Sequence, residues 1–181
     1  MSDQACYDIF IHGPEDRLDD LATNGVSARM ETCIDVRGIS HFFKHVGWGW
    51  ISIDRWEFWR DPRQSDFYQN GHYEKHYADL FRIAEKLEIA DEIRRRHEAD
   101  GQPLPMLYLN GVTGGNYPVD IAVELSLIYP DLLFDVHGDR LGISEGWWVI
   151  FGGRDYCLSY DGEMLVIDGQ LVVGSESQSS D

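Results

Sequence analysis

Two pairs of histidines are the first places in this chain where side chains of the right type and spacing could do chemistry. The pairs are His41 with His45 and His72 with His76. On a helix, this spacing places two imidazoles on one face, as a zinc or nickel site requires. The second pair lacks the Glu directly after the first His that zinc proteases use, and seven histidines in 181 residues make such spacing a common coincidence. We therefore expect no cofactor, and keep a four-histidine metal site as an alternative.

A second cluster lies at residues 134–140, where an imidazole stands between two carboxylates. In a strand, alternation would put Asp135, His137 and Asp139 on one face. A histidine beside carboxylates could act as a base. No Ser or Cys with a recognised nucleophile motif accompanies them, so we expect a solvated strand end with a turn at Gly138.

Residues 110–116, Asn-Gly-Val-Thr-Gly-Gly-Asn, join an expected strand to an expected helix. That is the setting of a phosphate-binding loop. The segment has neither the Lys-Ser/Thr of a P-loop nor the spaced glycines of a dinucleotide-binding fold. Acidic surroundings would also oppose phosphate, so we expect plain turn chemistry.

Tryptophan is concentrated in one short stretch, at Trp48, Trp50, Trp56 and Trp59. These are too many large side chains for one short strand to bury, and Trp is frequent at interface hot spots. They could anchor a partner. They could equally cover the core beneath a long helix, and this second interpretation is the one that we favour.

The charge of the chain is strongly acidic. Thirty-two Asp and Glu face fifteen Lys and Arg, for a net charge of −17, and −12 of this follows His97. Such a field repels nucleic acid and anionic membranes and attracts basic protein surfaces. Simple solubility or a salt-adapted source would explain it as well. The carboxylates that we expect to face a partner are Asp131, Asp135, Asp139, Glu145, Asp155, Asp161 and Glu163.

Length and composition predict one domain over residues 1–173, in which 40–103 could be an inserted segment, followed by a disordered acidic tail at 174–181. The sequence contains no apolar run of 18 residues, so we expect no membrane span. The first residues lack the pattern of a secretion signal. Three scattered cysteines favour buried thiols over a disulfide framework. We expect a cytoplasmic protein.

Hydrophobic periodicity and turn residues predict the order of the elements. We expect helices over 14–21, 72–97 and 118–129, and strands over 7–12, 48–59, 106–109 and 132–136, with 31–36 extended and 41–46 undecided between helix and strand. Two Asp-Gly pairs, Asp161-Gly162 and Asp168-Gly169, predict tight hairpins. Together these elements predict an α+β two-layer sandwich, with a mostly antiparallel sheet and helices packed on one face.

One group of motifs in the C-terminal half carries a family resemblance. Leu125-Ser126 and Tyr129-Pro130 lead into Leu133-Phe134, and aromatic residues and Gly152 follow in the next strands. These motifs cover about a third of the chain. In this part, the chain resembles the ferredoxin-like domain of small phage- and plasmid-encoded proteins of uncharacterised function. The resemblance implies a ferredoxin-like sheet and a mobile-element protein. It carries over no catalytic residue.

The charge, the lack of a complete catalytic motif and the resemblance together predict a non-enzymatic protein. Its acidic face would occupy a basic surface of a protein partner, as a nucleic-acid mimic or a phage anti-defence inhibitor such as an anti-CRISPR protein does. The expected partner is a nucleic-acid-binding protein or a toxin, with no direct contact to nucleic acid or membrane. The alternatives are a toxin immunity protein, a metal-dependent enzyme built on the four histidines, and a structural subunit.

Overall fold

Strand β1 (Gln4–His12) lies near the middle of the sheet, between β6 on one side and β5 on the other. It pairs antiparallel with β5 (Met106–Gly114) and with β6 (Leu133–Asp139). The computed structural model describes residues 4–26, 31–34, 40–46, 49–65, 83, 104–114, 118–139, 145–161 and 164–171. In β2 and β3 it describes the backbone alone.

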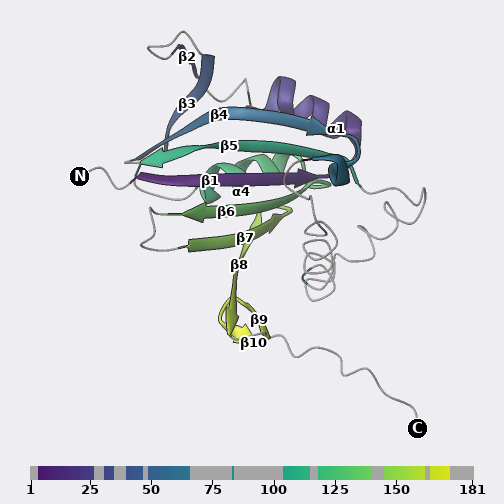
Figure 1. Cartoon of the computed structure of the whole chain (residues 1–181), viewed down its shortest axis with the longest axis vertical. Helices are drawn as coiled ribbons and strands as arrows, with labels where there is room; N and C mark the ends of the chain where they lie inside the picture. The colour runs from purple at the N-terminus through teal and green to yellow at the C-terminus, as the bar shows by residue number, and fades with distance from the viewer. Residues whose placement is uncertain are drawn as a thin grey trace.

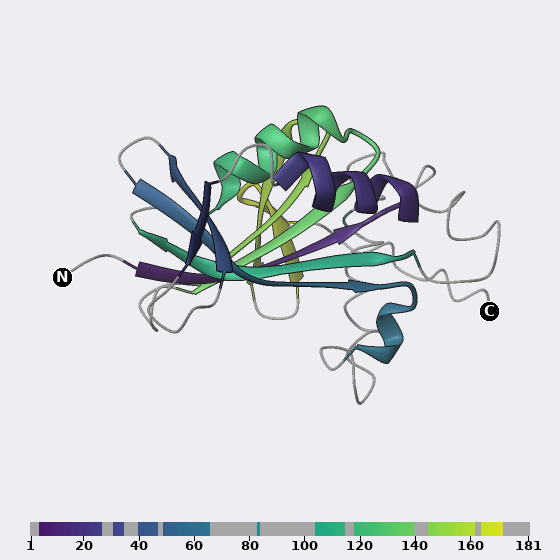
Figure 2. The same cartoon turned by 90° about the horizontal axis from the view of Figure 1, so that it is seen from above.

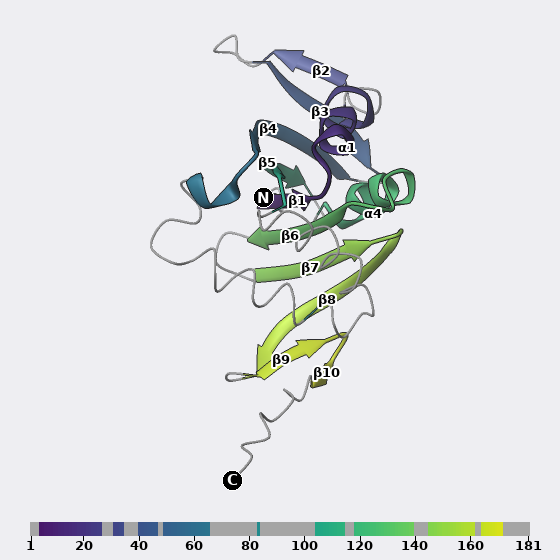
Figure 3. The same ribbon diagram turned by 90° about the vertical axis from the view of Figure 1, so that its right-hand side faces the viewer.

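Ten antiparallel strands form a single sheet around β1 (Figure 1). The strands on the β5 side are β4 (Gly49–Trp59), β3 (Ser40–Val46) and the edge strand β2 (Glu31–Ile34). The strands on the β6 side are β7 (Glu145–Phe151), β8 (Arg154–Asp161), β9 (Met164–Ile167) and the edge strand β10 (Gln170–Leu171). Figure 3 shows this order running from β2 at one end to β10 at the other.

Two helices cover one face of the sheet (Figure 2). Helix α1 (Glu15–Asp20) follows β1 and continues as a π-helical turn over Leu21–Val26. Helix α4 (Val119–Ile128) joins β5 to β6, which are parallel to each other with β1 between them, so the helix makes the long crossover that parallel strands need. We call α1, its π-helical turn and α4 the helix layer.

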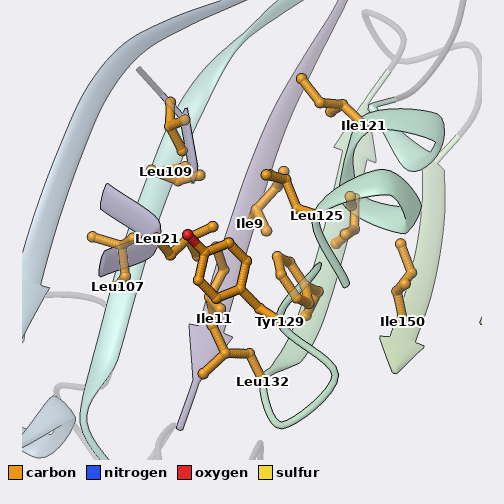
Figure 4. Packing of buried hydrophobic residues seen from close by; sticks show 14 of the residues in the cluster. Ile9, Ile11, Leu21, Leu107, Leu109, Ile121, Leu125, Tyr129, Leu132 and Ile150 are labelled. Carbon is orange, nitrogen blue, oxygen red and sulfur yellow. The ribbon is translucent and has the colours of Figure 1, made fainter. Parts of the chain in front are cut away.

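The hydrophobic core fills the space between the helix layer and the central strands (Figure 4). Alternate residues of β1 point into it, and the register places the core residues of β5 and β6 directly opposite them. The helices contribute residues at three- and four-residue spacing, as an amphipathic helix should. The buried cluster includes Ile9, Ile11, Leu18, Leu21, Leu107, Leu109, Ile121, Leu125, Tyr129, Phe134, Val136 and Ile150.

The hairpins of the C-terminal half follow the predicted turn chemistry. Asp168 and Gly169 have φ of 50° and 77° between paired residues of β9 and β10, as a tight hairpin requires. Asp161 pairs with Met164 across the β8–β9 turn. A third hairpin, between β7 and β8, uses Gly152 and Gly153 with φ of 57° and 82°.

The mostly antiparallel sheet is confirmed, and the two helices described pack on one of its faces. Residues 41–46 form strand β3, which decides between the two possibilities left open by the sequence. The predicted helix over 72–97 and the tail at 174–181 lie outside the described residues, apart from Ile83, which is helical and buried. Among the described residues, no helix is both long and apolar enough to cross a membrane.

The turn predicted at 110–116 is wrong for its first five residues, because β5 continues to Gly114. Asn110 is held in the strand by donating to the Tyr7 carbonyl at 3.1 Å. Gly111 then lies against the Ser52 carbonyl of β4 and the hydroxyl of Tyr7, which itself donates to that carbonyl. The glycine therefore allows close approach of two strands, which is one use of glycine within a sheet.

Replacing Gly111 with Ala tests this close packing. The added Cβ would overlap the Ser52 carbonyl oxygen, so we expect the free energy of unfolding to fall by about 3 kcal/mol, as overpacking does. Urea denaturation followed by tryptophan fluorescence measures it. The matched control is Gly152→Ala, where a Cβ meets nothing within 4 Å and the positive φ alone should cost about 1 kcal/mol. Equal losses for the two variants would contradict the close approach.

Candidate functional site

Asp8, Asp135 and His137 meet on the face of the sheet opposite the helix layer. The register places His137 of β6 directly between Asp8 of β1 and Trp147 of β7. Asp135 lies two residues before His137 on the same strand, and so on the same face. Three neighbouring strands therefore bring two carboxylates and one imidazole together.

The carboxylate of Asp135 is the most deeply buried member, with 0% exposure. Its Oδ1 atom accepts a hydrogen bond from Trp147 Nε1 at 2.7 Å. The same oxygen lies 3.0 Å from Nε2 of His137. A buried charge is tolerated when it is paired and hydrogen-bonded, so the indole and the imidazole account for how this carboxylate is accommodated.

Aromatic rings fix the orientation of the His137 ring. It stacks on Trp147, with centroids 5.5 Å apart and planes 18° apart, and it meets the Phe10 ring edge-on at 5.8 Å. Phe10 in turn packs against Tyr108 at 5.3 Å. The imidazole therefore has one preferred plane, with Nε2 towards Asp135.

Charge sets the titration of His137. Burial by itself lowers the pKa of His137, but the charge of Asp135, its hydrogen bond and the charge of Asp8 act in the other direction. The net effect raises the pKa of His137 above its ordinary value of 6.5. The folded protein therefore favours an imidazolium between two carboxylates.

The carboxylate of Asp8 extends the cluster to a fourth strand. Its Oδ1 atom accepts hydrogen bonds from the Tyr108 hydroxyl and from Asn110 Nδ2, the latter at 2.9 Å. Both donors are on β5. We call Asp8, Tyr108, Asn110, Asp135, His137 and Trp147 the polar cluster.

The prediction of a solvated strand end at Gly138 is therefore wrong. Strand β6 has β1 on one side and β7 on the other, so Asp135 is enclosed and the strand continues through Gly138 to Asp139. Asp135 also cannot be among the carboxylates presented to a partner, since it is fully buried. The alternation that put Asp135 and His137 on one face did indicate their proximity. Trp147 and Asp8 carried no sequence signal that linked them to it.

A second candidate surface is the outer side of the helix layer. Asp16 and Asp19 of α1 and Asp120 and Glu124 of α4 are all exposed. Among residues 15–26 and 119–128, Arg17 is the sole basic residue. The sequence did not mark this surface, because the two acidic pairs are about a hundred residues apart.

Contacts between α1 and the segment just after α4 hold these acids on one surface. Arg17 binds Asp131, just after α4, through Nε at 2.9 Å and Nη2 at 3.2 Å, and its guanidinium lies 4.9 Å from the centre of the Tyr129 ring. Tyr129 donates to Asp20 at 3.0 Å. Hydrogen bonds from Asn24 and Tyr129 lower the pKa of Asp20, so it is charged at neutral pH. The one arginine of the layer is thus engaged within it.

The structure separates the acids that the sequence grouped. Asp131 is held by Arg17, and Glu163 lies outside the described residues. The exposed members are near the ends of strands β6, β7 and β8: Asp139, Glu145, Asp155 and Asp161. We call these four the strand-end acids.

The two tryptophans of strand β4 whose side chains are described, Trp56 and Trp59, do not share one surface. Trp56 pairs with Leu109 and Trp59 with Met106, and an odd separation on a regular stretch of strand puts the two on opposite faces. Trp56 is exposed and Trp59 is partly buried. Trp50 lies in β4 opposite Gly114, with its side chain undescribed, and Trp48 lies outside the described residues.

The geometry assumed for the first histidine pair does not apply. His41 and His45 lie on strand β3, where four residues span about 13 Å, too far for the two rings to bind one ion as they would on a helix. His72 and His76 lie outside the described residues. Within the part of the chain that the structure describes, no three His, Cys, Asp or Glu side chains are grouped as a metal site would need.

The His137 contacts predict a pH-dependent contribution to stability. Because the folded-state pKa is raised, the imidazolium stabilises the fold fully below the ordinary pKa of 6.5 and loses this effect as pH rises through the raised value. Below pH 6.5 we expect the free energy of unfolding of the wild type to exceed that of His137→Gln by on the order of 1 kcal/mol. Solvent screening limits this figure. Urea denaturation of both proteins across this pH range measures the difference. A gap that widens with rising pH would contradict the assignment.

Asp135→Asn tests which carboxylate sets that titration. Removing the nearer charge should lower the pKa of His137, which NMR titration of the imidazole measures directly. Asp139→Asn is the matched control, because Asp139 is exposed and two residues from His137 on the same strand. Equal shifts in the two variants would show that general charge, and not the contact with Asp135, determines the pKa.

Comparisons with protein-family models, with curated proteins and with solved structures found no match to this chain.

Proposed function

We propose that this chain is a non-enzymatic acidic protein that occupies a basic surface of a protein partner. The carboxylates of the helix layer would take the place of nucleic-acid phosphates, as in a nucleic-acid mimic. The partner would then be a nucleic-acid-binding protein or a toxin. A phage anti-defence inhibitor, of which anti-CRISPR proteins are one kind, is the instance that fits the mobile-element resemblance.

One observation carries this proposal: four exposed carboxylates lie on the outer side of the helix layer, whose own arginine is bound to a neighbouring carboxylate. Asp16, Asp19, Asp120 and Glu124 are exposed, and Arg17 is bound to Asp131. A surface with an excess of negative charge speeds encounter with a positive one and disfavours partners of like charge. The contacts of α1 with Tyr129 and Asp131, just after α4, support it further, because a rigid arrangement of charges loses less entropy on binding than a flexible one.

We further propose that the central part of the sheet has a ferredoxin-like fold. The central strands have the order β6-β1-β5-β4, and the chain passes through them as β1, α1, β4, β5, α4 and β6. This order supports a ferredoxin-like β-α-β-β-α-β core, extended by β2 and β3 at one end and by β7 to β10 at the other. A function does not follow from such a core, since one fold hosts many activities.

The test is capture of partners by the tagged protein at two salt concentrations, with two matched variants. One variant neutralises four acids of the helix layer (Asp16→Asn, Asp19→Asn, Asp120→Asn, Glu124→Gln). The other neutralises the four strand-end acids (Asp139→Asn, Glu145→Gln, Asp155→Asn, Asp161→Asn). The two variants lose the same charge from different places.

We expect a basic protein to be captured at about 50 mM salt and to be lost at about 300 mM, because exposed charges are screened within a few ångströms at high salt. The helix-layer variant should bind about tenfold more weakly at low salt, and the strand-end variant should bind like the wild type. Salt-independent capture, or equal losses in both variants, would contradict an acidic helix layer as the binding surface. A toxin immunity protein would give the same dependence on charge, and the identity of the captured protein distinguishes the two.

The metal-dependent alternative has a separate test. Elemental analysis of untagged protein should find no stoichiometric zinc if the four histidines do not form a site. Zinc that is lost in His72→Ala would support an enzyme instead.

A further inference from the structure

Trp56 and Phe58 form an exposed aromatic pair on strand β4. They are two residues apart, opposite Leu109 and Leu107 of β5, so they share the face of the sheet that carries the helix layer. Their exposed fractions are 40% and 37%. Among the described residues, the other large apolar side chains with comparable exposure are Leu127 and Ile128 of α4.

The aromatic pair lies beside the acids of α1. Arg60 follows Phe58 by two residues, and its guanidinium binds Glu15 of α1 through Nη2 at 2.7 Å and Nε at 2.9 Å. Glu15 therefore lies near the end of this strand, and Asp19, four residues further along α1, is on the same side of that helix. The aromatic rings, the carboxylates and Arg60 therefore belong to one surface, made of Trp56, Phe58, Arg60, Glu15 and Asp19, which we call the aromatic–acid surface.

We propose that the aromatic–acid surface binds an arginine-rich segment of the protein partner. This inference rests on the proposed function and adds to it the chemistry of the partner. Guanidinium groups are planar and weakly hydrated, so they stack on aromatic rings while they pair with carboxylates. The ammonium group of lysine is compact and strongly hydrated, and gains less from the rings.

Charge and ring chemistry separate this occupant from others. Carboxylates alone would attract arginine and lysine alike, because both carry one positive charge. The exposed rings supply the preference for arginine. Nucleic acid is disfavoured here by the same carboxylates, and an uncharged apolar segment would make no favourable electrostatic contact with Asp19.

Two homopeptides of equal length, one of arginine and one of lysine, test the proposal on the full-length chain. Fluorescence anisotropy of labelled peptide, at about 50 mM salt, gives both dissociation constants. For the wild type we expect arginine to bind roughly five- to tenfold more tightly than lysine. Binding of both should weaken as salt rises.

Variants locate the preference. Trp56→Ala with Phe58→Ala should bring the arginine-to-lysine ratio to about one and leave lysine binding largely unchanged. Trp56→Leu with Phe58→Leu keeps apolar area without rings, and should give the same ratio even if the alanine variant is less stable. Glu15→Gln with Asp19→Asn should weaken both peptides and keep the ratio. Leu127→Ala with Ile128→Ala, on α4, is the matched apolar control and should behave like the wild type.

The proposal is overturned if the wild type binds both peptides equally, if it binds neither, or if the preference survives both aromatic variants. Those outcomes leave the proposed function standing, since a lysine-rich or folded basic partner could still meet the acidic helix layer. Failure of the proposed function would be seen in the capture experiment, if capture of the partner depended neither on salt nor on the charge of the helix layer.

Discussion

A carboxylate that is removed from water must be held by groups of the protein itself, and Asp135 is such a carboxylate near the centre of the sheet. Its partners come from two strands, His137 on β6 and Trp147 on β7. A shift of β6 by one residue would turn every side chain of that strand to the other face. It would place this carboxylate in the apolar core. The polar cluster thus opposes any alternative pairing of β1, β6 and β7, and the helix layer can be positioned only if that pairing is correct.

The two faces of the sheet are stabilised by different physical effects. Beneath the helix layer the contacts are apolar, and burial of Ile9, Leu125 and their neighbours supplies the driving force. On the opposite face, side-chain hydrogen bonds join β5 to β1 and β7 to β6, and an ion pair lies within β6. Apolar burial tolerates small changes in geometry, whereas hydrogen bonds and ion pairs do not. Net negative charge is then carried on the outside, where repulsion between Asp16, Asp19, Asp120 and Glu124 is relieved by water.

Local patterns predicted the elements well, and long-range pairing could not be predicted in the same way. Alternation identified β1, three- and four-residue spacing identified α4, and Asp168-Gly169 identified a hairpin. Each of these signals is contained within a few residues. The burial of Asp135 depends on β1 lying beside β6, and the surface shared by Asp16 and Asp120 depends on α1 lying beside α4. A single sequence holds no direct record of such neighbours, so the local pattern around His137 predicts only a solvated strand end. The split of Trp56 and Trp59 needed only their register, which the irregularity between Ile53 and Arg55 obscures.

The central place of β1 has a consequence for biosynthesis. Its two neighbours, β5 and β6, begin at Met106 and Leu133, so a ribosome must release most of the chain before either side of β1 can be covered. Until then, Ile9 and Ile11 have no native strand beside them. Closing so long a loop makes folding slow and leaves unpaired strands open to aggregation. Fragments that end before β6 should therefore fold poorly and bind chaperones.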